Sequence, residues 1–191
     1  MGKQGSFFKR LTDIIFSILL LILSFPILLI SIIAIKLDSK GPAFFVQDRT
    51  GLNGVPFKMI KFRGMVDNAT KIGPQITQEN DQRITRVGKI LRRTSIDEIP
   101  QVINVLKGEM SLIGPRPEIT SITSTFTDDQ RRVFEFKPGI TGYSQVNGRQ
   151  RLSPEQRVNM EVQYYSKANL KSDLKIALST FKVVINNNGN I

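Results

Sequence analysis

The stretch that decides the fold runs from Ile14 to Ile35 and reads IIFSILLLILSFPILLISIIAI. It contains no charged residue, and nearly every position is Ile, Leu or Phe. At a rise of about 1.5 Å per residue, a helix of this length crosses a hydrocarbon core of about 30 Å. The chain continues into Lys36, Asp38 and Lys40 rather than a small-residue cleavage site, so we expect the segment to be retained as a membrane anchor.

Two features bear on how this segment sits in a membrane. Pro26 lies in its middle, where it removes a helix hydrogen bond, and basic residues flank it, with Lys9 and Arg10 before it and Lys36 after it. A re-entrant helix-break-helix that returns to the same face accounts for both facts, with the Ser24 hydroxyl able to bond a carbonyl that the proline frees. A kinked single span is the alternative that the residues leave open.

Composition limits the chemistry of the remaining chain. The 191 residues include 27 Lys and Arg against 16 Asp and Glu, a formal net charge of +11. This excess favours anionic partners: phosphorylated substrates, an acidic membrane surface or nucleic acid. Cys, His and Trp are absent, which excludes disulfides, thiol nucleophiles, Ser-His-Asp triads and Cys/His zinc sites. Catalysis therefore depends on carboxylates, Lys, Arg and a hard metal ion.

After an anchor of residues 1–40, residues 41–191 are expected to form one small, mostly helical α+β catalytic domain. The runs 43–47 and 55–62 around Gly51–Gly54 predict a short β-hairpin. Residues 67–82 are polar and contain Gly73 and Pro74, which predicts a loop.

Helical periodicity predicts amphipathic surface helices in this domain. Apolar and basic residues alternate at helical spacing over Ile84–Arg93, typical of a helix on an anionic surface. A second helix is expected over Ser95–Leu106, with a capping box at its start and Lys107-Gly108 at its end. Further helices follow Ser153 and cover Leu174–Ile185, whose apolar stripe is assigned to the core.

Asp97 and Glu98 form an adjacent acidic pair close to Arg92 and Arg93. In a helix first turn, the macrodipole favours the ionised carboxylates, which can then act as nucleophile or metal ligand. An ordinary helix cap uses the same residue types, so the pair alone does not establish a site.

Basic residues on rigid segments favour the functional interpretation. Gly114–Pro117 and Lys137–Gly142 are too rich in Gly and Pro for strand or helix interiors and are predicted as rigid turns. Such turns, with neighbouring basic residues, suit phosphate oxygens. The side chains concerned are Lys61, Arg63, Arg116, Lys137 and Arg149. A phosphate site of this kind usually employs Mg²⁺, for which Glu98 is the predicted ligand.

Five segments, taken together in order, resemble the bacterial sugar transferase family. They are Gly41–Gln47, Lys61–Met65, Arg92–Gln101, Leu106–Pro117 and Lys137–Arg149. The resemblance covers nearly the whole chain and is to the small monotopic phosphoglycosyl transferases, which begin surface glycan and glycoconjugate assembly on polyprenyl (undecaprenyl) phosphate.

The resemblance implies a two-step reaction. Asp97 attacks the β-phosphate of a UDP-sugar and releases UMP, and polyprenyl phosphate then takes the phosphosugar from the aspartate. By analogy with the family, Glu98 helps to hold Mg²⁺, and Arg149 meets the nucleotide. Lys61 belongs to the predicted phosphate-binding set, and the analogy places three arginines beside the phosphates: Arg63, Arg92 and Arg116.

The resemblance also implies a re-entrant membrane helix broken at a Ser-Pro step, in the bacterial inner membrane with the active site on its cytoplasmic face. Membrane lipid is then a partner, nucleic acid is not, and a homo-oligomer or contacts with downstream glycosyltransferases are left open. This chain departs from the family pattern at Phe25, which separates Ser24 from Pro26, at Lys137, where arginine is usual, and at Val162, where an acidic residue often lies. Glu161 is adjacent, but a shift of one residue turns a helical side chain by about 100°, so we assign it no catalytic role.

Two alternatives belong to other classes. The basic excess and the Gly139–Gly142 GxxG pattern are compatible with a membrane-anchored binder of nucleic acid or anionic lipid. An inactive anchor that recruits other glycan enzymes is the second. The transferred sugar is not specified by any motif.

Overall fold

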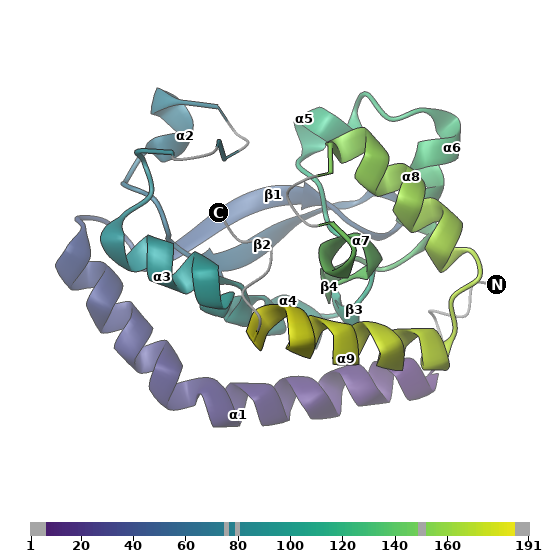
Figure 1. Cartoon of the computed structure of the whole chain (residues 1–191), viewed down its shortest axis with the longest axis horizontal. Helices are drawn as coiled ribbons and strands as arrows, with labels where there is room; N and C mark the ends of the chain where they lie inside the picture. Colours follow the sequence, from purple (N-terminus) through teal and green to yellow (C-terminus); the bar gives the residue numbers. More distant parts are fainter. Residues whose placement is uncertain (1–6, 75–76, 79–80, 149–151, 186–191) are drawn as a thin grey trace.

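The computed structural model describes residues 7–74, 77–78, 81–148 and 152–185, and its fold is a helix-rich α+β arrangement with short sheets, as predicted (Figure 1). The helices are α1 (Phe7–Asp38), α2 (Ala69–Ile72), α3 (Arg86–Thr94), α4 (Val102–Lys107), α5 (Thr120–Thr123), α6 (Asp128–Arg131), α7 (Tyr143–Val146), α8 (Pro154–Tyr165) and α9 (Leu170–Ile185). Short 3₁₀ helices are η2 (Leu52–Gly54), η3 (Ile96–Gln101) and η4 (Arg132–Glu135). The strands are β1 (Phe44–Thr50), β2 (Pro56–Phe62), β3 (Ser111–Ile113) and β4 (Gly139–Thr141).

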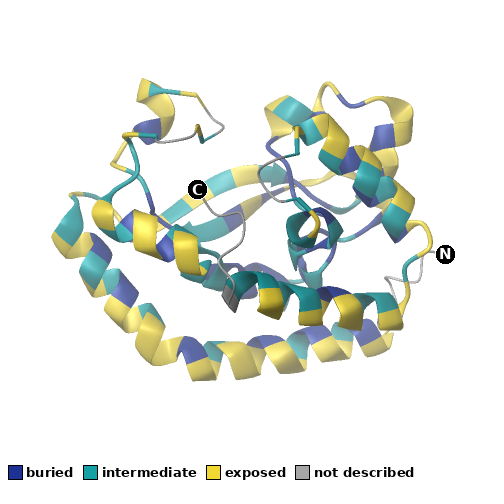
Figure 2. Cartoon of the chain, viewed as in Figure 1, coloured by how far each residue is buried: buried dark blue, intermediate teal, exposed yellow. Residues whose placement is uncertain are grey.

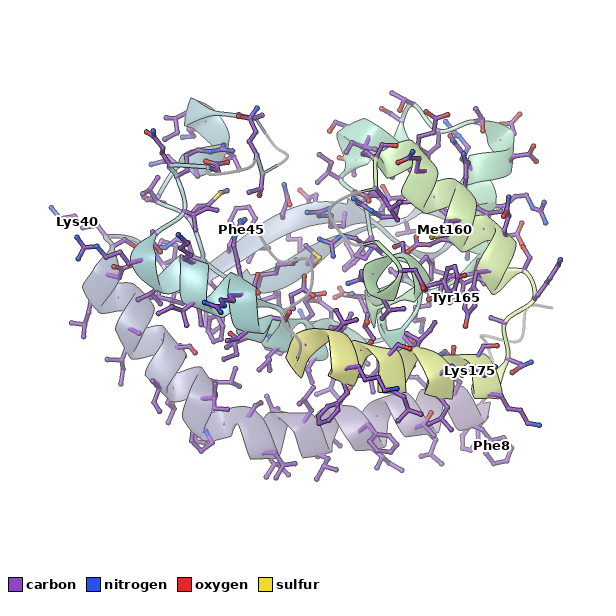
Figure 3. All side chains as sticks on the ribbon, viewed as in Figure 1. Phe8, Lys40, Phe45, Met160, Tyr165 and Lys175 are labelled. Carbon is purple, nitrogen blue, oxygen red and sulfur yellow. The ribbon has the colours of Figure 1, made fainter. Side chains whose placement is uncertain are left out.

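Helix α1 buries a polar stripe and exposes its apolar face. Five polar residues are at most 6% exposed and recur at helical spacings. They are Lys9, Asp13, Ser17, Ser24 and Ser31. Figure 2 shows the exposed residues along the outer side of the helix, and Figure 3 shows Phe8 projecting away from the other elements. The helix is long and apolar enough to cross a membrane, and only 17% of its most apolar window is buried.

Pro26 lies inside a continuous helix rather than at an unwound break. The Ser24 hydroxyl donates to the Leu20 carbonyl at 2.6 Å, whereas the carbonyl that Pro26 leaves without its usual donor is that of Ile22. The predicted bond from Ser24 to the freed carbonyl is therefore wrong, because the serine bonds one turn back along its own helix. Such back-bonding and proline both bend helices, and α1 follows a bent path (Figure 1).

The N-terminal end of α1 is fixed to the domain by ionic side chains. Lys9 forms an ion pair with Asp173 of α9 at 2.6 Å. Arg10 donates to the carbonyls of Val105 and Leu106 at 2.6 and 2.9 Å, at the end of α4, where helix carbonyls lack intrahelical partners.

The C-terminal end of α1 is attached to the same domain. Arg63 donates to the carbonyls of Lys40 and Ser39 at 2.6 and 2.8 Å, and the Asp38 carboxylate accepts from the Val87 amide at 2.9 Å. Both ends of α1 therefore contact residues 41–191. The predicted domain boundary after residue 40 falls between α1 and β1 and stays a prediction.

Strands β1 and β2 form the predicted antiparallel hairpin, with β1 extending to Thr50. Its register pairs Phe45 with Lys61 and Gln47 with Met59. Because directly opposed residues share a face and alternate residues follow them, Gln47 and Arg49 lie on the same face as Lys61. The same face carries Phe57 and Met59, which are buried in an apolar cluster, so the polar side chains of this face lie beside part of the core.

Strands β3 and β4 form a small parallel pair. A Cβ on Gly139 would lie 2.1 Å from the Gly114 amide nitrogen, so the two backbones approach too closely for any larger residue. The prediction that Lys137–Gly142 is only a rigid turn is therefore wrong, because the glycines permit strand pairing instead of preventing it. The described residues between 67 and 82 lie largely in the predicted loop, with α2 as one short helix among them.

The apolar stripe of α9 lies on the surface, so its assignment to the core is wrong. Leu174, Leu178 and Phe181 are 62%, 60% and 68% exposed, whereas Ile176 is buried. Helix α9 runs beside the N-terminal half of α1 (Figure 1). A periodic stripe identifies an apolar face but does not say what covers it.

Candidate active site

The acidic pair is carried by a tight turn between α3 and α4. Helix α3 ends at Ser95, whose φ of 58° and ψ of 16° are left-handed and reverse the chain into η3. The predicted capping box is wrong, because Ser95 makes no side-chain cap in this conformation. Pro100 lies within η3, and α4 begins after it. This geometry places Asp97 and Glu98 directly after the basic last turn of α3.

Glu98 is paired with two predicted phosphate-binding residues. Its Oε1 atom lies 2.8 Å from Lys61 Nζ of β2 and 3.7 Å from Arg116 Nη1 of the turn after β3. The Lys61 and Glu98 side chains are 14% and 21% exposed. The structure therefore brings Lys61, Glu98 and Arg116 together from segments far apart in the sequence.

Burial and neighbouring charges have opposing effects on the pKa of Asp97. Burial, followed by repulsion from Glu98, raises the pKa of Asp97 to about 6, against the opposing attraction of Lys61, Arg92 and Arg116. The expectation that the pair's setting favours the ionised form is therefore wrong for Asp97, because desolvation outweighs its neighbours. The carboxylate is still ionised at neutral pH and lies among three cations.

The arginines on either side are themselves partly desolvated. Burial lowers the pKa of Arg92, and its Nη1 donates to Thr77 Oγ1 at 3.1 Å. Burial opposes the charged form of Arg116 as well, but the nearby acids, Glu98 and Glu118 foremost, raise its pKa overall. Both side chains remain cationic and can pair with phosphate oxygens.

Not every predicted site residue joins this cluster. Arg63 is 5% exposed and its terminal nitrogens bond the end of α1, so the geometry assigns it to holding that helix rather than to phosphate. Ser24 and Pro26 lie within α1. Arg149 lies outside the described residues.

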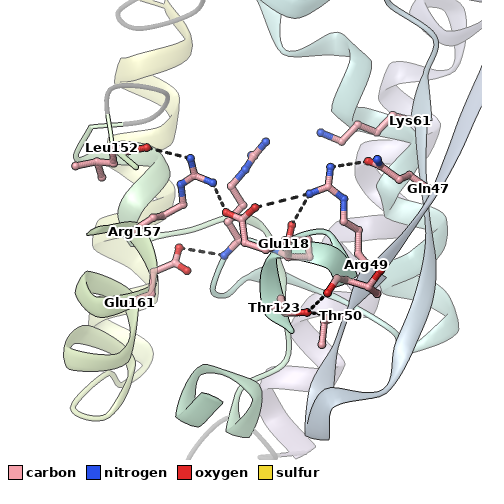
Figure 4. Close-up of polar contacts among 12 residues, drawn as sticks. Gln47, Arg49, Thr50, Lys61, Glu118, Thr123, Leu152, Arg157 and Glu161 are labelled. Carbon is pink, nitrogen blue, oxygen red and sulfur yellow. Dashed lines mark hydrogen bonds and ion pairs between the residues drawn. The ribbon is translucent and has the colours of Figure 1, made fainter. Parts of the chain in front are cut away.

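An ionic network beside the cluster was not identified from the sequence. Glu118 pairs with Arg157 of α8 and lies 3.9 Å from Arg49 of β1, and Arg49 also donates to the Pro117 carbonyl and to Gln47 (Figure 4). Burial lowers the pKa of Arg49 to about 10, with Arg116 contributing. The hairpin register, which puts Arg49 on the face of Lys61, is the signal that could have found it.

Glu161, and not Val162, directs its side chain toward this region. Glu161 is 2% exposed and accepts from the Arg116 amide and the Ser144 hydroxyl. Val162 packs among apolar side chains near Phe126, Val133 and Val158. The carboxylate that reaches this region therefore comes from Glu161, to which we assigned no catalytic role from the sequence.

Few acidic side chains are available to a magnesium ion at this cluster. In the part of the chain that the structure describes, no group of three or more acidic side chains gathers to bind a metal. Magnesium bound to nucleotides commonly uses one or two protein carboxylates, with phosphate oxygens and waters completing its shell. The Asp97-Glu98 pair fits that requirement.

The site thus combines a buried carboxylate with three nearby cations, a setting suited to phosphate ligands, in a domain that packs against an apolar helix long enough to cross a membrane. The family model described as bacterial sugar transferase matches residues 4–187. The chain belongs to this family, which confirms the resemblance seen in its motifs.

Curated relatives agree with this assignment. The chain is 41% identical to the uncharacterized sugar transferase EpsL of Bacillus subtilis, over 95% of this chain and 89% of that one. It is 41% identical to the UDP-glucose:undecaprenyl-phosphate glucose-1-phosphate transferase of Caulobacter vibrioides, over 90% of this chain and 67% of that one. It is 39% identical to the UDP-N-acetylgalactosamine-undecaprenyl-phosphate N-acetylgalactosaminephosphotransferase of Aeromonas hydrophila, over 94% of this chain but only 44% of that longer protein.

Proposed function

We propose that this protein transfers a phosphosugar from a UDP-sugar to undecaprenyl phosphate through a covalent intermediate on Asp97. The observation that best supports this proposal is the setting of the Asp97 carboxylate. It is buried, and the charges of Lys61, Arg92 and Arg116 act on it. The names of the Caulobacter and Aeromonas relatives support the overall reaction.

The first step forms an acyl phosphate, a mixed anhydride between the Asp97 carboxyl group and the phosphosugar. A carboxylate oxygen of Asp97 attacks the β-phosphorus, and the bond from that phosphorus to the bridging oxygen breaks. UMP leaves with the bridging oxygen, and the phosphosugar remains on Asp97. Lys61 and Arg116 offset the charge of the phosphate groups, and fixed cations of this kind stabilise charge that develops in a transition state.

The second step regenerates the enzyme. An oxygen of undecaprenyl phosphate attacks the same phosphorus, the bond to Asp97 breaks, and the carboxylate is restored as the diphosphate-linked sugar leaves. Using one carboxylate for both steps lets two anionic substrates occupy one site in turn.

Glu98 is the residue that would hold Mg²⁺, which when bound neutralises pyrophosphate charge. In the structure Glu98 is balanced by Lys61 and Arg116. These two ion pairs hold the Glu98 carboxylate beside the position where the phosphates are proposed to bind.

We further propose that α1 enters the inner membrane from the cytoplasmic face and returns to it. Both ends of α1 bond to the same domain, which favours the re-entrant arrangement over a span with ends on opposite sides. The outward apolar residues of α1 and α9 provide the lipid contact.

The transferred sugar is not assigned. The relatives named above act, by their names, on glucose in one case and on N-acetylgalactosamine in another. Similarity at about this level therefore spans different sugars, and the substrate must be found by assay.

The proposal is tested by measuring UMP release from a panel of UDP-sugars in the presence of undecaprenyl phosphate and Mg²⁺. We expect release with at least one sugar, and loss of at least about 10³-fold in Asp97→Asn, because the amide is not a nucleophile. Asp48→Asn is the matched control, since Asp48 is an exposed aspartate on β1 paired only with Lys58 among its described ion pairs. Full turnover in Asp97→Asn, or no release with any UDP-sugar, contradicts the proposed function.

A further inference from the structure

A buried carboxylate of α8 holds the backbone of the phosphate-binding turn. Glu161 Oε1 accepts from the Arg116 amide at 3.0 Å and from the Ser144 hydroxyl at 2.5 Å. Glu161 is 2% and Ser144 is 0% exposed. Figure 4 shows the Glu161 carboxylate directed at this backbone nitrogen. Both bonds end on the same oxygen, so one acceptor atom joins α7, α8 and the turn.

A negative charge on Glu161 is energetically unfavourable because the side chain is buried. Burial raises the pKa of Glu161 to about 7, although the bonds from Ser144 and Arg116 oppose that rise. Two charged groups act on it: Glu118, which follows the turn, raises its pKa further, and Arg157 of α8 lowers it. Tyr165, the last residue of α8 (labelled in Figure 3), is buried and also interacts with it. Burying a carboxylate costs free energy that its hydrogen bonds and charge partners must offset, and here those hydrogen bonds hold a segment of the active site.

The residue held by Glu161 is Arg116, whose backbone amide and side-chain guanidinium have different partners. Its amide is fixed by Glu161, and its guanidinium faces Glu98 at 3.7 Å. Pro115 and Pro117 restrict the backbone on both sides. The Arg116 amide therefore donates to the one side-chain acceptor that ties this residue to α8 among the described contacts. The flanking carbonyls are held as well, since Pro115 accepts from the Gly139 amide and Pro117 accepts from Arg49.

We propose that Glu161, oriented by Ser144, is a positioning residue that fixes the Arg116 guanidinium where it contacts the transferred phosphate. This inference rests on the proposed function, because it assigns Glu161 a part in the same reaction. Glu161 touches no substrate and acts through Arg116. A misplacement of about 1 Å in such a group can cost on the order of 10²-fold in rate.

Two substitutions of Glu161 distinguish the contribution of its hydrogen-bond acceptor from the contribution of its negative charge. Glu161→Gln keeps an oxygen that can accept both bonds, whereas Glu161→Met has similar length and no such acceptor. We expect Glu161→Met to lower kcat/KM for UMP release by about 30-fold or more, and Glu161→Gln to stay within about fivefold of the wild type. Glu155→Met, an exposed change on the first turn of the same helix, is the matched control and is expected to have no effect. Equal losses in Gln and Met variants overturn the proposal.

A double-mutant cycle tests whether Glu161 acts through Arg116 and not through general stability. In the Arg116→Ala background, Glu161→Met is expected to cost less than about threefold more, because the side chain it positions is gone. Circular dichroism and a melting curve for each variant show whether it is folded. If the loss of kcat/KM in the folded double mutant equals the product of the losses in the two single mutants, the inference is overturned, even though the wild type is active. The proposed function fails separately, if the wild-type protein releases no UMP.

Discussion

Asp97 and Glu98 are neighbours in the sequence but differ in their settings. Glu98 is neutralised by direct contact with Lys61, whereas desolvation keeps the Asp97 proton to a higher pH than usual. A desolvated carboxylate is a better nucleophile once it is ionised, and the neighbouring cations keep it ionised at neutral pH. The local environment therefore supports unequal roles for the two acids.

This difference predicts an acid limb in the pH profile. Asp97 must be ionised to attack, and its pKa is raised to about 6, so kcat/KM for UMP release should fall about tenfold per pH unit below that value. Lys61 lowers the pKa of Asp97, so Lys61→Met should move the midpoint to higher pH. A profile flat from pH 5 to 8, or a midpoint that moves downward in Lys61→Met, contradicts the assignment.

Arg63 is predicted to stabilise the fold rather than bind substrate. Replacing it by Met removes the donors of two carbonyls at the end of α1 and should lower the free energy of unfolding by about 2 kcal/mol. The KM for UDP-sugar should change less than about threefold. The control is Arg86→Met, an exposed arginine at the start of α3, measured by the same melting curves in detergent. A large rise in KM without a change in melting temperature restores the original phosphate-binding hypothesis.

At the scale of elements, the sequence predicted those structures whose signals are local. The Ser153-Pro154 start of α8 and the Gly108 end of α4 were found because capping residues act within a few positions. The β1–β2 hairpin was found because its turn and flanking runs are contiguous. Pairing of β3 with β4 was missed because it depends on two glycines brought together from distant segments.

The residues of the candidate site likewise fall into two groups: those that local motifs indicate and those that only tertiary packing brings together. Asp97, Glu98, Lys61, Arg92 and Arg116 were identified because motifs mark them. The buried bonds of Glu161 and the ionic network of Arg49 depend on which helix face and which strand face turn inward, which tertiary packing decides. Arg63 has the composition of a phosphate ligand but lies against the end of a helix, a distinction that charge alone cannot make.

Helix α8 should make stability depend on pH through Glu161. Burial raises the pKa of Glu161 in the folded state to about 7, above its ordinary value of 4.5, so the folded state binds the proton more tightly than the unfolded state. The stability present below about pH 4.5 is therefore lost as pH rises through 7, by at most about 3 kcal/mol.

Glu161→Gln should remove this dependence, because glutamine has no charge to bury. The variant should melt at a higher temperature than the wild type at pH 8, and the difference should shrink at pH 5. Scanning calorimetry in detergent at both values measures it, with Glu155→Gln as the control. A variant less stable than the wild type at pH 8 argues against a charged, buried Glu161.

At the scale of the whole molecule, α1 and α9 form an outward apolar surface while the polar stripe of α1 is bonded to the domain. The active-site cluster is built on segments that contact α1 or its ends, so the membrane segment and the site are held in one arrangement. This arrangement suits the proposed reaction between a water-soluble nucleotide sugar and a lipid phosphate, in which both substrates reach Asp97 near the membrane surface.

The re-entrant arrangement predicts that both ends of α1 face the cytoplasm. The chain has no cysteine, so single cysteines at Phe7, which is 74% exposed, and at exposed Lys40 can be labelled without background. Both should react with a membrane-impermeant maleimide in inverted vesicles and neither in right-side-out vesicles. Reaction of one site in each vesicle type indicates a single kinked span.

The central claim is that Asp97 carries the phosphosugar during turnover. The most direct measurement is mass spectrometry of the protein incubated with an accepted UDP-sugar and Mg²⁺ but without undecaprenyl phosphate. We expect a mass increase equal to one phosphosugar, located on Asp97 by fragmentation and lost when undecaprenyl phosphate is added. An unmodified Asp97 in rapidly quenched samples of protein that turns over when the acceptor is present, or an adduct at another residue, contradicts the account.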